Sequence, residues 1–181
     1  TRISRELNST LDLSYLMQRV YDEALRTTSA DCGTIMLFEL GSGEEVEEPR
    51  LLLHLGDRPA VEWGEQERWV LHHNESLLVE DYEQPEGQNI PLALTVEQGL
   101  TQPHAGVRSS LLVPIAYQGQ VAGLIWLHAY TTHAFDSSAR QISEALAIQA
   151  AIALGNAHRY EELFRRSELL NRRVEAFARL L

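Results

Sequence analysis

The chain has 181 residues, 44% hydrophobic and 23% charged, which favours one globular domain with a substantial core. Its formal net charge is −11 and every basic residue is an arginine, which argues against general binding to nucleic acids or anionic membranes. One cysteine, Cys32, excludes an internal disulfide, and no apolar run is long enough to span a membrane. We therefore expect a cytoplasmic segment that makes no membrane contact.

The first third of the chain predicts helix followed by a pair of strands. Residues 1–10 have the spacing of a short helix, and a second helix follows that Asp12 or Ser14 caps. Two β-rich runs, 34–40 and 50–56, flank a polar loop and predict an antiparallel pair.

The middle third is less regular. Residues 65–73 predict a short helix that ends at a left-handed Asn74, and 76–81 predict a short strand. Residues 82–106 carry three prolines, three glycines and no clear period, apart from a helical turn at 94–98. Loops of this length inside a domain are often functional lids.

Residues 106–130 predict a β-hairpin that turns at Gln118-Gly119. Alternation separates the second strand into two faces. One face carries Val121, Gly123, Ile125 and Leu127. The other carries Ala122, Leu124, Trp126 and His128. Gly123 is expected to let a helix approach the sheet closely.

The turn leaves the register of the partner strand open. A two-residue turn puts Ser109, Leu111 and Val113 on the Trp126 face. A three-residue loop with a bulge at Gly119 puts Ser110, Leu112 and Pro114 there instead.

From residue 137 the chain contains one glycine and no proline, and a heptad seam runs to its end. The seam predicts a parallel homodimer through the first and last helices, because the projecting half of so long a helix needs a partner. Its residues are Ile142, Leu146, Gln149, Ala153, Asn156, Tyr160, Leu163, Ser167, Leu170, Val174, Phe177 and Leu181.

These elements predict an α+β fold, an antiparallel sheet of five or six strands with helices on both sides and a long C-terminal helix. We expect the end of a preceding linker helix at 1–10, one domain at 11–160 and the start of a signalling helix at 161–181. The start at Thr1 and the absence of a helix stop signal indicate a piece of a longer protein.

Residues 11 to about 160 resemble the GAF domain family. The matching residues follow its Ser-x-Leu-x-Val-Pro strand, its Gly-x-Leu strand and its Phe-Asp and Gln-x-Ala-x-Ala helix motifs. They are Ser110, Leu112, Val113, Pro114, Gly119, Gly123, Phe135, Gln149, Ala151, Ala153, Asn156 and Ala157. The resemblance implies a sensor module of a signalling protein such as a two-component histidine kinase, with a small-ligand pocket opposite the first and last helices. On that basis we expect these helices on the Gly123 face of the second hairpin strand and the pocket on its Trp126 face.

Two departures from the family bear on ligands. The Asn-Lys-x-Phe motif of cyclic-nucleotide-binding members and the Cys-His pair that attaches bilins are both absent. We therefore expect no bilin, and the scattered histidines predict no metal site. Haem bound through His104 or His128 is the minor alternative, and we expect these histidines to be hydrogen-bonded pocket or loop residues instead.

The candidate pocket residues are polar or aromatic side chains near the expected lid. Asp81 is expected to receive a ligand donor or to cap its loop, and Arg108 to bind an anionic ligand or a neighbouring carboxylate. The full set is Trp69, Asp81, Tyr82, His104, Arg108, Ser109, Ser110, Trp126 and His128.

Three functions follow from these features. The first is a non-enzymatic sensory domain that relays a signal through a dimeric helix to an output domain. The second is a structural dimerisation module without a ligand, which apolar filling around Trp126 and His128 would favour. The third, a methionine-sulfoxide reductase, requires reactive cysteines, and the single Cys32 has no resolving partner.

Overall fold

The computed structural model describes residues 2–39, 49–56, 64–96 and 100–181, with side chains from residue 12 onward except at 95 and 96. The polar loop predicted after the first strand lies almost wholly outside these ranges. The elements are α1 (Arg2–Thr27), β1 (Cys32–Phe38), β2 (Leu51–Gly56), α2 (Glu65–His73), β3 (Leu77–Val79), α3 (Leu92–Val96), β4 (Ser109–Tyr117), β5 (Gln120–Ala129) and α4 (Ser137–Leu180).

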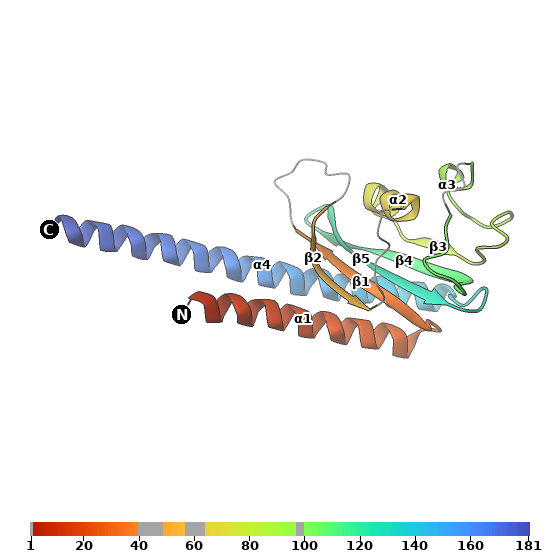
Figure 1. Ribbon diagram of the computed structural model, residues 1–181, viewed down its shortest axis with the longest axis horizontal. Helices are drawn as coiled ribbons and strands as arrows, with labels where there is room; N and C mark the ends of the chain where they lie inside the picture. Colours follow the sequence, from red (N-terminus) through yellow and green to blue (C-terminus); the bar gives the residue numbers. More distant parts are fainter. Residues whose placement is uncertain (1, 40–48, 57–63, 97–99) are drawn as a thin grey trace.

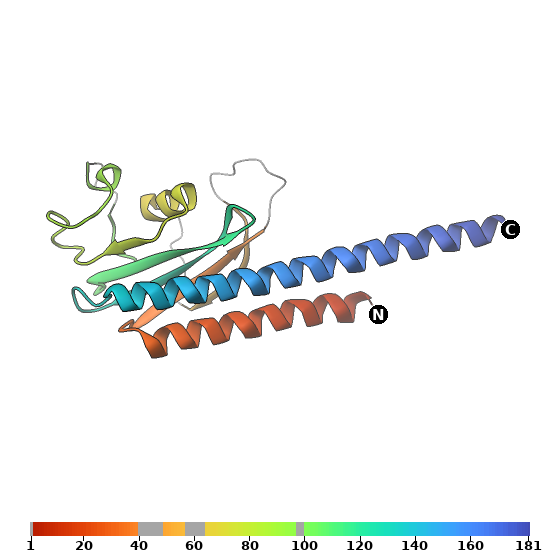
Figure 2. The ribbon, with the colours of Figure 1, turned by 180° about the vertical axis from the view of Figure 1, so that it is seen from behind.

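The described strands form one antiparallel five-stranded sheet in the order β2-β1-β5-β4-β3. Helices α1 and α4 cover one face, and α2 and α3 lie over the other (Figures 1 and 2). This confirms the predicted α+β architecture and the predicted pairing of the two strands after α1.

We call the face of the sheet under α1 and α4 the helix face, and the opposite face, under α2 and α3, the α2 face. The helix face carries the larger core. Aliphatic side chains of α1 and α4 pack there on β1, β4 and β5, with Leu13, Met17, Leu111, Ile125 and Leu154 among the buried residues. The two helices run antiparallel, so both chain ends emerge at one end of the molecule (Figure 1).

Helix α1 corrects the prediction of two N-terminal helices. It is continuous from Arg2, and no helix begins at Asp12 or Ser14. Its sequence contains neither glycine nor proline, and the stripe from Leu13 to Ala24 keeps one face buried against the sheet. The expected boundaries near 10 and 160 thus lie inside unbroken helices, and that division of the chain stays a prediction.

The β4–β5 hairpin combines features of both predicted alternatives. Tyr117 faces Gln120, so the turn has two residues, and Gln118 (φ 50°) and Gly119 (φ 78°) both adopt the left-handed conformation of a type I′ turn. The extra residue lies farther along β5, where Ile115 faces Gly123 and Ala116 faces Val121. Ala122 is therefore a β-bulge.

The bulge reverses two of the predicted side-chain directions. Ala122 packs in the core of the helix face, whereas Val121 packs on the α2 face, the opposite of the prediction for both. Beyond the bulge, Ile125 and Leu127 lie on the helix face and Leu124 and Trp126 on the α2 face, as predicted. The extra residue also decides the faces of the β4 side chains. Leu112 lies on the α2 face, and Leu111 and Val113 lie on the helix face.

The role expected for Gly123 was wrong. A Cβ atom there would lie 2.4 Å from the backbone oxygen of Met36 and 2.8 Å from Leu37 Cδ2. It is the neighbouring strand β1, rather than a helix, that approaches this glycine.

Helix α2 has the predicted bounds and the predicted left-handed cap at Asn74 (φ 52°). At its start the Glu67 carboxylate accepts a hydrogen bond from the backbone N–H of Gly64, which satisfies one free donor of the first turn. Its inner side, with Val70, packs on the α2 face of the sheet.

Candidate regulatory site

The α2 face gathers several of the predicted pocket residues on β4 and β5. Ser110 faces His128 and Leu112 faces Trp126 across the two strands. Ser110 Oγ and His128 Nδ1 share a 3.0 Å hydrogen bond, and both residues are fully buried. The Trp126 and His128 rings meet edge to face, with centroids 5.1 Å apart.

Tyr82 connects this group to α2. Its hydroxyl donates a 3.0 Å hydrogen bond to Gln66 Oε1, and Gln66 Nε2 donates to the carbonyl of Thr101 at 2.7 Å. Burial raises the pKa of Tyr82, so the phenol stays protonated and remains a donor at physiological pH. Gln66 therefore ties together α2, the segment after β3 and the segment before β4.

Trp126 is the member of this group whose polar atom is unsatisfied. The side chain is 7% exposed, and its Nε1 makes no well-formed hydrogen bond to a described residue, although the indole N–H lies near enough to the Tyr82 hydroxyl to act against the rise in the pKa of that phenol. A buried N–H without an acceptor costs about 1–3 kcal/mol. The site thus presents a donor that a water or a ligand acceptor would satisfy.

Trp126 belongs to a cluster of apolar side chains on the α2 face. They come from β1, β3, β4, β5, α2, α3 and the loops between them. The buried members are Met36, Phe38, Val70, Leu77, Val79, Tyr82, Leu94, Val107, Leu112, Leu124 and Trp126.

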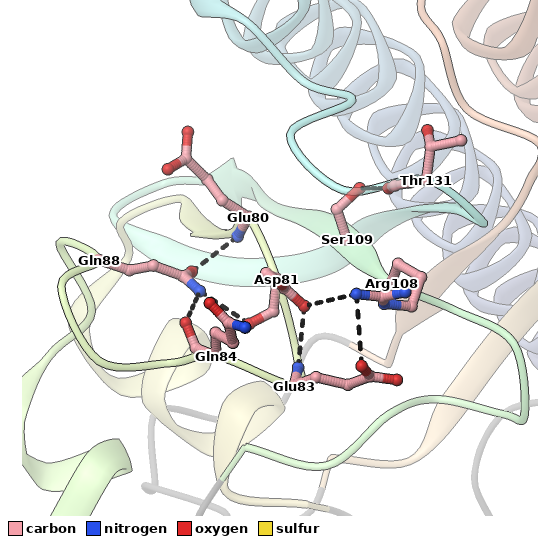
Figure 3. A network of polar contacts seen from close by, with 8 residues as sticks. All are labelled: Glu80, Asp81, Glu83, Gln84, Gln88, Arg108, Ser109 and Thr131. Carbon is pink, nitrogen blue, oxygen red and sulfur yellow. Dashed lines mark hydrogen bonds and ion pairs between the residues drawn. The ribbon is translucent and has the colours of Figure 1, made fainter.

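A second group fixes the loop that follows β3 (Figure 3). Asp81 Oδ1 accepts a 3.0 Å hydrogen bond from the backbone N–H of Glu83, so it caps its own loop, as one of its two predicted roles required. Arg108 Nη2 lies 3.4 Å from both the Asp81 and the Glu83 carboxylates. Arg108 thus binds carboxylates of the chain itself, while its buried Nε has no partner among the described residues.

Gln88 holds the same loop closed from within (Figure 3). Its Nε2 donates to the carbonyls of Asp81 and Gln84, both at 2.7 Å, and its Oε1 accepts from the backbone N–H of Glu80 at 2.8 Å. One side chain therefore replaces several of the backbone hydrogen bonds that a loop lacks.

His104 lies at the edge of the site, beside Cys32. Its Nε2 is 3.7 Å from Cys32 Sγ, its ring contacts the ring of His128 edge to face, and Tyr130 Oη lies 3.6 Å from the same sulfur. In the part of the chain that the structure describes, no three His, Cys, Asp or Glu residues are grouped as metal ligands would be.

Two predicted residues lie apart from the centre of the site. Ser109 lies two residues before Leu111 and therefore on the same side of β4, the helix face. Its hydroxyl donates a 2.7 Å hydrogen bond to the carbonyl of Thr131. Trp69, on α2, stacks on His73 and packs only at the margin of the apolar cluster.

Gln66 and Gln88 were not predicted. Gln66 had a sequence signal, since it lies four residues before Val70 on the inner side of α2, where a polar residue needs a buried partner. Gln88 had none, because its role depends on the path of an irregular loop.

A groove of about 640 Å³ lies on the other side of the molecule from the expected pocket. It runs between β4 and α4, with Tyr117 on one wall and Ile148 and Ile152 on the other. Gly155 allows this approach, because a Cβ atom there would lie 2.7 Å from the Tyr117 ring.

The predicted heptad seam divides into two parts on α4. Leu146 is buried in the core, and Ile142 and Ala153 are half-buried against it, so the structure places these three inside the domain instead of at a surface for a partner. The seam residues that are exposed are Gln149, Asn156, Tyr160, Leu163, Ser167, Leu170, Val174, Phe177 and Leu181.

No helix in the described ranges is long and apolar enough to cross a membrane. Comparison with curated proteins finds no significant match.

Solved structures match at low sequence identity. A type II free methionine-R-sulfoxide reductase from Thermoplasma acidophilum is 14% identical, with a TM-score of 0.60 over 84% of this chain and 96% of that one. The GAF domain region of a Geobacter sulfurreducens PCA protein is 21% identical (TM-score 0.58; 86% and 99% covered). The GAF domain of an Acinetobacter phosphoenolpyruvate-protein phosphotransferase is 16% identical (TM-score 0.56; 87% and 95% covered). At these identities the likeness shows the fold.

The family comparison is more specific than the structural one. The model of the GAF domain matches residues 12–154, the span that holds the sheet, α1 from residue 12 onward and α4 up to residue 154. The chain belongs to the GAF domain family, whose members are sensory and regulatory modules of signalling proteins.

Proposed function

We propose that this GAF domain senses a small molecule on its α2 face and passes the signal through α1 and α4 to an output domain, such as that of a histidine kinase. The observation that carries the proposal is the buried Nε1 of Trp126, which lies near the Tyr82 hydroxyl but makes no well-formed hydrogen bond to a described residue. Every other polar side chain near it, on Tyr82, Ser110 and Gln66, has a partner. A ligand with a hydrogen-bond acceptor would complete the group.

The relay follows from the position of β5 at the centre of the sheet. Trp126 lies on the α2 face, while its neighbours Ile125 and Leu127 pack under α1 and α4. A movement of this strand therefore reaches the helix core directly. The ligand shifts the helices only if it binds one arrangement of the strand more tightly than the other.

Native mass spectrometry of the purified chain tests the proposal. We expect a retained small molecule, and we expect Trp126→Phe to lose it, because phenylalanine keeps an aromatic ring but has no N–H donor. Gln118→Glu, at the exposed hairpin turn, is the control and should keep the molecule. Retention by Trp126→Phe would contradict the role of Nε1. An absorption spectrum of the same sample checks the expectation that the molecule is neither haem nor bilin.

The packing on the α2 face supports a second candidate, a structural dimerisation module without a ligand. Trp126 belongs to an apolar cluster of described residues on this face, whereas the groove between β4 and α4 lies on the other face. This candidate predicts that no small molecule is retained and that Trp126→Phe leaves dimerisation unchanged.

We propose that the domain is not itself an enzyme. One structural neighbour is a methionine-sulfoxide reductase, but Cys32 is the single cysteine of this chain and no second thiol can resolve an oxidised intermediate. Reductase activity with free methionine sulfoxide that survived Cys32→Ser would overturn this argument.

A further inference from the structure

One edge of β4 is only partly paired. β3 is short and pairs with β4 from Ser110 to Leu112, whereas β4 continues to Tyr117. On its other side β4 pairs with β5 along its whole length. Among the described residues, no strand therefore lies beside Val113–Tyr117 on the β3 side. An unpaired strand edge is a template on which another strand can add.

Alternate residues of β4 direct their backbone groups toward this free edge. Just before the strand, the carbonyl of Arg108 accepts a 2.9 Å hydrogen bond from the N–H of Tyr82, which follows β3. In steps of two from Arg108, the backbone groups of Pro114 and Ala116 point to the same side. Pro114 agrees with this direction, because proline has no N–H and is tolerated in a sheet mainly at an unpaired edge. The free edge thus offers the carbonyls of Pro114 and Ala116 and the Ala116 N–H.

The groove between β4 and α4 lies along this edge, where the two elements run side by side (Figure 2). Residues of Val113–Tyr117 line it on the strand side. On the helix side it is lined by Ile148 and Ile152, which are 62% and 58% exposed. The small residues Ala151 and Gly155 leave the space between the two sides open. The groove therefore has one wall with free backbone hydrogen-bonding groups and one apolar wall.

The two ends of the groove differ in charge. At the hairpin end, Arg159 donates a 2.9 Å hydrogen bond to Asn156, a neutral side chain that leaves the charge of the guanidinium uncompensated. At the opposite end, Glu144 is paired with Arg140 at 3.1 Å, and Glu75 adds a second carboxylate. This end carries a net negative charge, so the groove as a whole favours an occupant with an acidic and a basic end.

We propose that the groove binds an extended peptide segment of a partner protein, which adds a strand to β4 in line with β3. Side chains alternate along a strand, so every second side chain of the segment faces α4. There, apolar side chains pack on Ile148 and Ile152. An acidic side chain pairs with Arg159 at one end, and a basic side chain lies near Glu75 at the other. The site is separate from the small-molecule site on the α2 face, and the inference does not depend on that site.

The dimensions of the two walls favour a short strand as the occupant. The part of β4 from Val113 to Tyr117 extends about 17 Å at 3.4 Å per residue. The α4 wall from Glu144 to Arg159 extends about 22 Å at 1.5 Å per residue. An extended segment of about six residues matches both lengths. It also pairs with the free backbone groups of the edge, which is the general mode of strand addition.

Fluorescence anisotropy of a labelled synthetic peptide tests the site. The test peptide is Thr-Glu-Thr-Val-Thr-Val-Thr-Lys-Thr with both ends blocked, so its even positions carry the side chains expected to face α4. Running antiparallel to β4, it places its glutamate near Arg159 and its lysine near Glu75. We expect saturable binding to the wild-type chain and at least about fivefold weaker binding to Ile152→Gln, which puts an amide on the apolar wall. Gln149→Ala, exposed on α4 outside the groove, is the control and should change the Kd by less than about twofold.

Backbone substitutions test strand addition itself. In an added strand alternate N–H groups face β4, so N-methylation of two adjacent central residues of the peptide, one at a time, should have unequal effects. We expect at least about tenfold weaker binding from one and less than about threefold from the other. Ala116→Pro should also weaken binding about tenfold, because it removes the N–H that the edge offers, whereas Ala116→Ser keeps that N–H and should bind as wild type. Circular dichroism verifies that each variant folds.

Charge reversal tests the polarity of the groove. Arg159→Glu should weaken binding of the test peptide about threefold to fivefold, and a peptide with lysine in place of its glutamate should recover the loss. Arg166→Glu, on α4 beyond the groove, is the control and should have less than about a twofold effect. Equal effects of the two reversals would show that only the net charge of the chain is sensed, and this would overturn the placement of the acidic end.

Other results would overturn the inference as a whole. Absence of saturable binding by the wild-type chain up to about 1 mM would remove the site. Equal losses for the two N-methylated peptides would show that no strand is added. A fall in bound peptide as the chain concentration rises would show that a second copy occupies the groove instead. Trp126→Phe should bind the test peptide as wild type does, so failure of the small-molecule proposal would leave this result unchanged.

Discussion

Glu67 is a buried carboxylate whose charged form is destabilised by its surroundings. The residue is 5% exposed at the start of α2, and burial raises its pKa although the Gly64 N–H donates to its charged form. A folded-state pKa above the unfolded value means that the folded chain binds the proton more tightly. The contribution of Glu67 to stability is therefore greatest below its ordinary pKa of 4.5 and falls as the pH rises above it.

We expect Glu67→Gln to remove this loss of stability at higher pH. The amide oxygen can still accept from Gly64, but glutamine carries no charge at any pH, so the variant should be more stable than wild type at pH 7 by up to about 1 kcal/mol. Urea unfolding at pH 4 to 7 measures the difference, which should grow with pH. A difference that is constant across this range would contradict the assignment.

The sequence predicts the face on which a strand residue lies only where the strand alternates regularly. Trp126 and His128 lie where period-two alternation placed them, because the strand is regular beyond Gly123. The choice between Ser109 and Ser110 could not be made, because it depends on the bulge at Ala122. No local preference fixes a bulge there, since it arises from packing on both faces of the sheet at once.

At the level of elements, the β1–β5 pair at the centre of the sheet depends on Gly123. We expect Gly123→Ala to destabilise the fold by roughly 2 kcal/mol or more, because the new methyl group would overlap the backbone oxygen of Met36, which cannot move without breaking the pairing. Thermal or urea unfolding measures this cost.

Gly119→Asn is the matched control in the same hairpin. A Cβ atom at Gly119 has no heavy atom within 4 Å, and asparagine tolerates its left-handed backbone, so the change should cost less than about 0.5 kcal/mol. Equal losses in the two variants would show that the hairpin as a whole is sensitive and that the contact with Met36 is not the cause.

Helix α4 illustrates a different limit of sequence reasoning. Its heptad pattern predicted a long helix correctly, yet a seam of period 3.5 drifts by about 20° per heptad on a straight helix of period 3.6. Within the domain, this seam contains both buried Leu146 and exposed Gln149, and from residue 169 onward every side of the helix is exposed. Which part serves the fold and which serves a partner therefore depends on where the sheet covers the helix, and the pattern does not encode that.

At the scale of the whole molecule, the antiparallel α1–α4 pair determines how a signal could leave the domain. Both chain ends lie at the same end of the molecule, away from α3 and its loops (Figure 1). A change on the α2 face must therefore pass through the sheet and along α4. In the proposed relay, the projecting half of α4 carries the signal, while its exposed side chains contribute little to the fold of the monomer.

That separation gives a prediction for Phe177→Glu. Residues 169–181 are all exposed, so the variant should leave the thermal midpoint unchanged at concentrations where the chain is monomeric. At high concentration the midpoint of wild type should rise, because association stabilises the folded state by mass action, and the rise should be smaller in the variant. Scanning calorimetry over about a hundredfold range of concentration measures both limits. Ala176→Glu adds the same charge on another side of the same helical turn and should behave as wild type. If both variants lowered the midpoint equally at every concentration, the projecting helix would be part of the monomer's stability, and its exposed apolar side chains would need no partner.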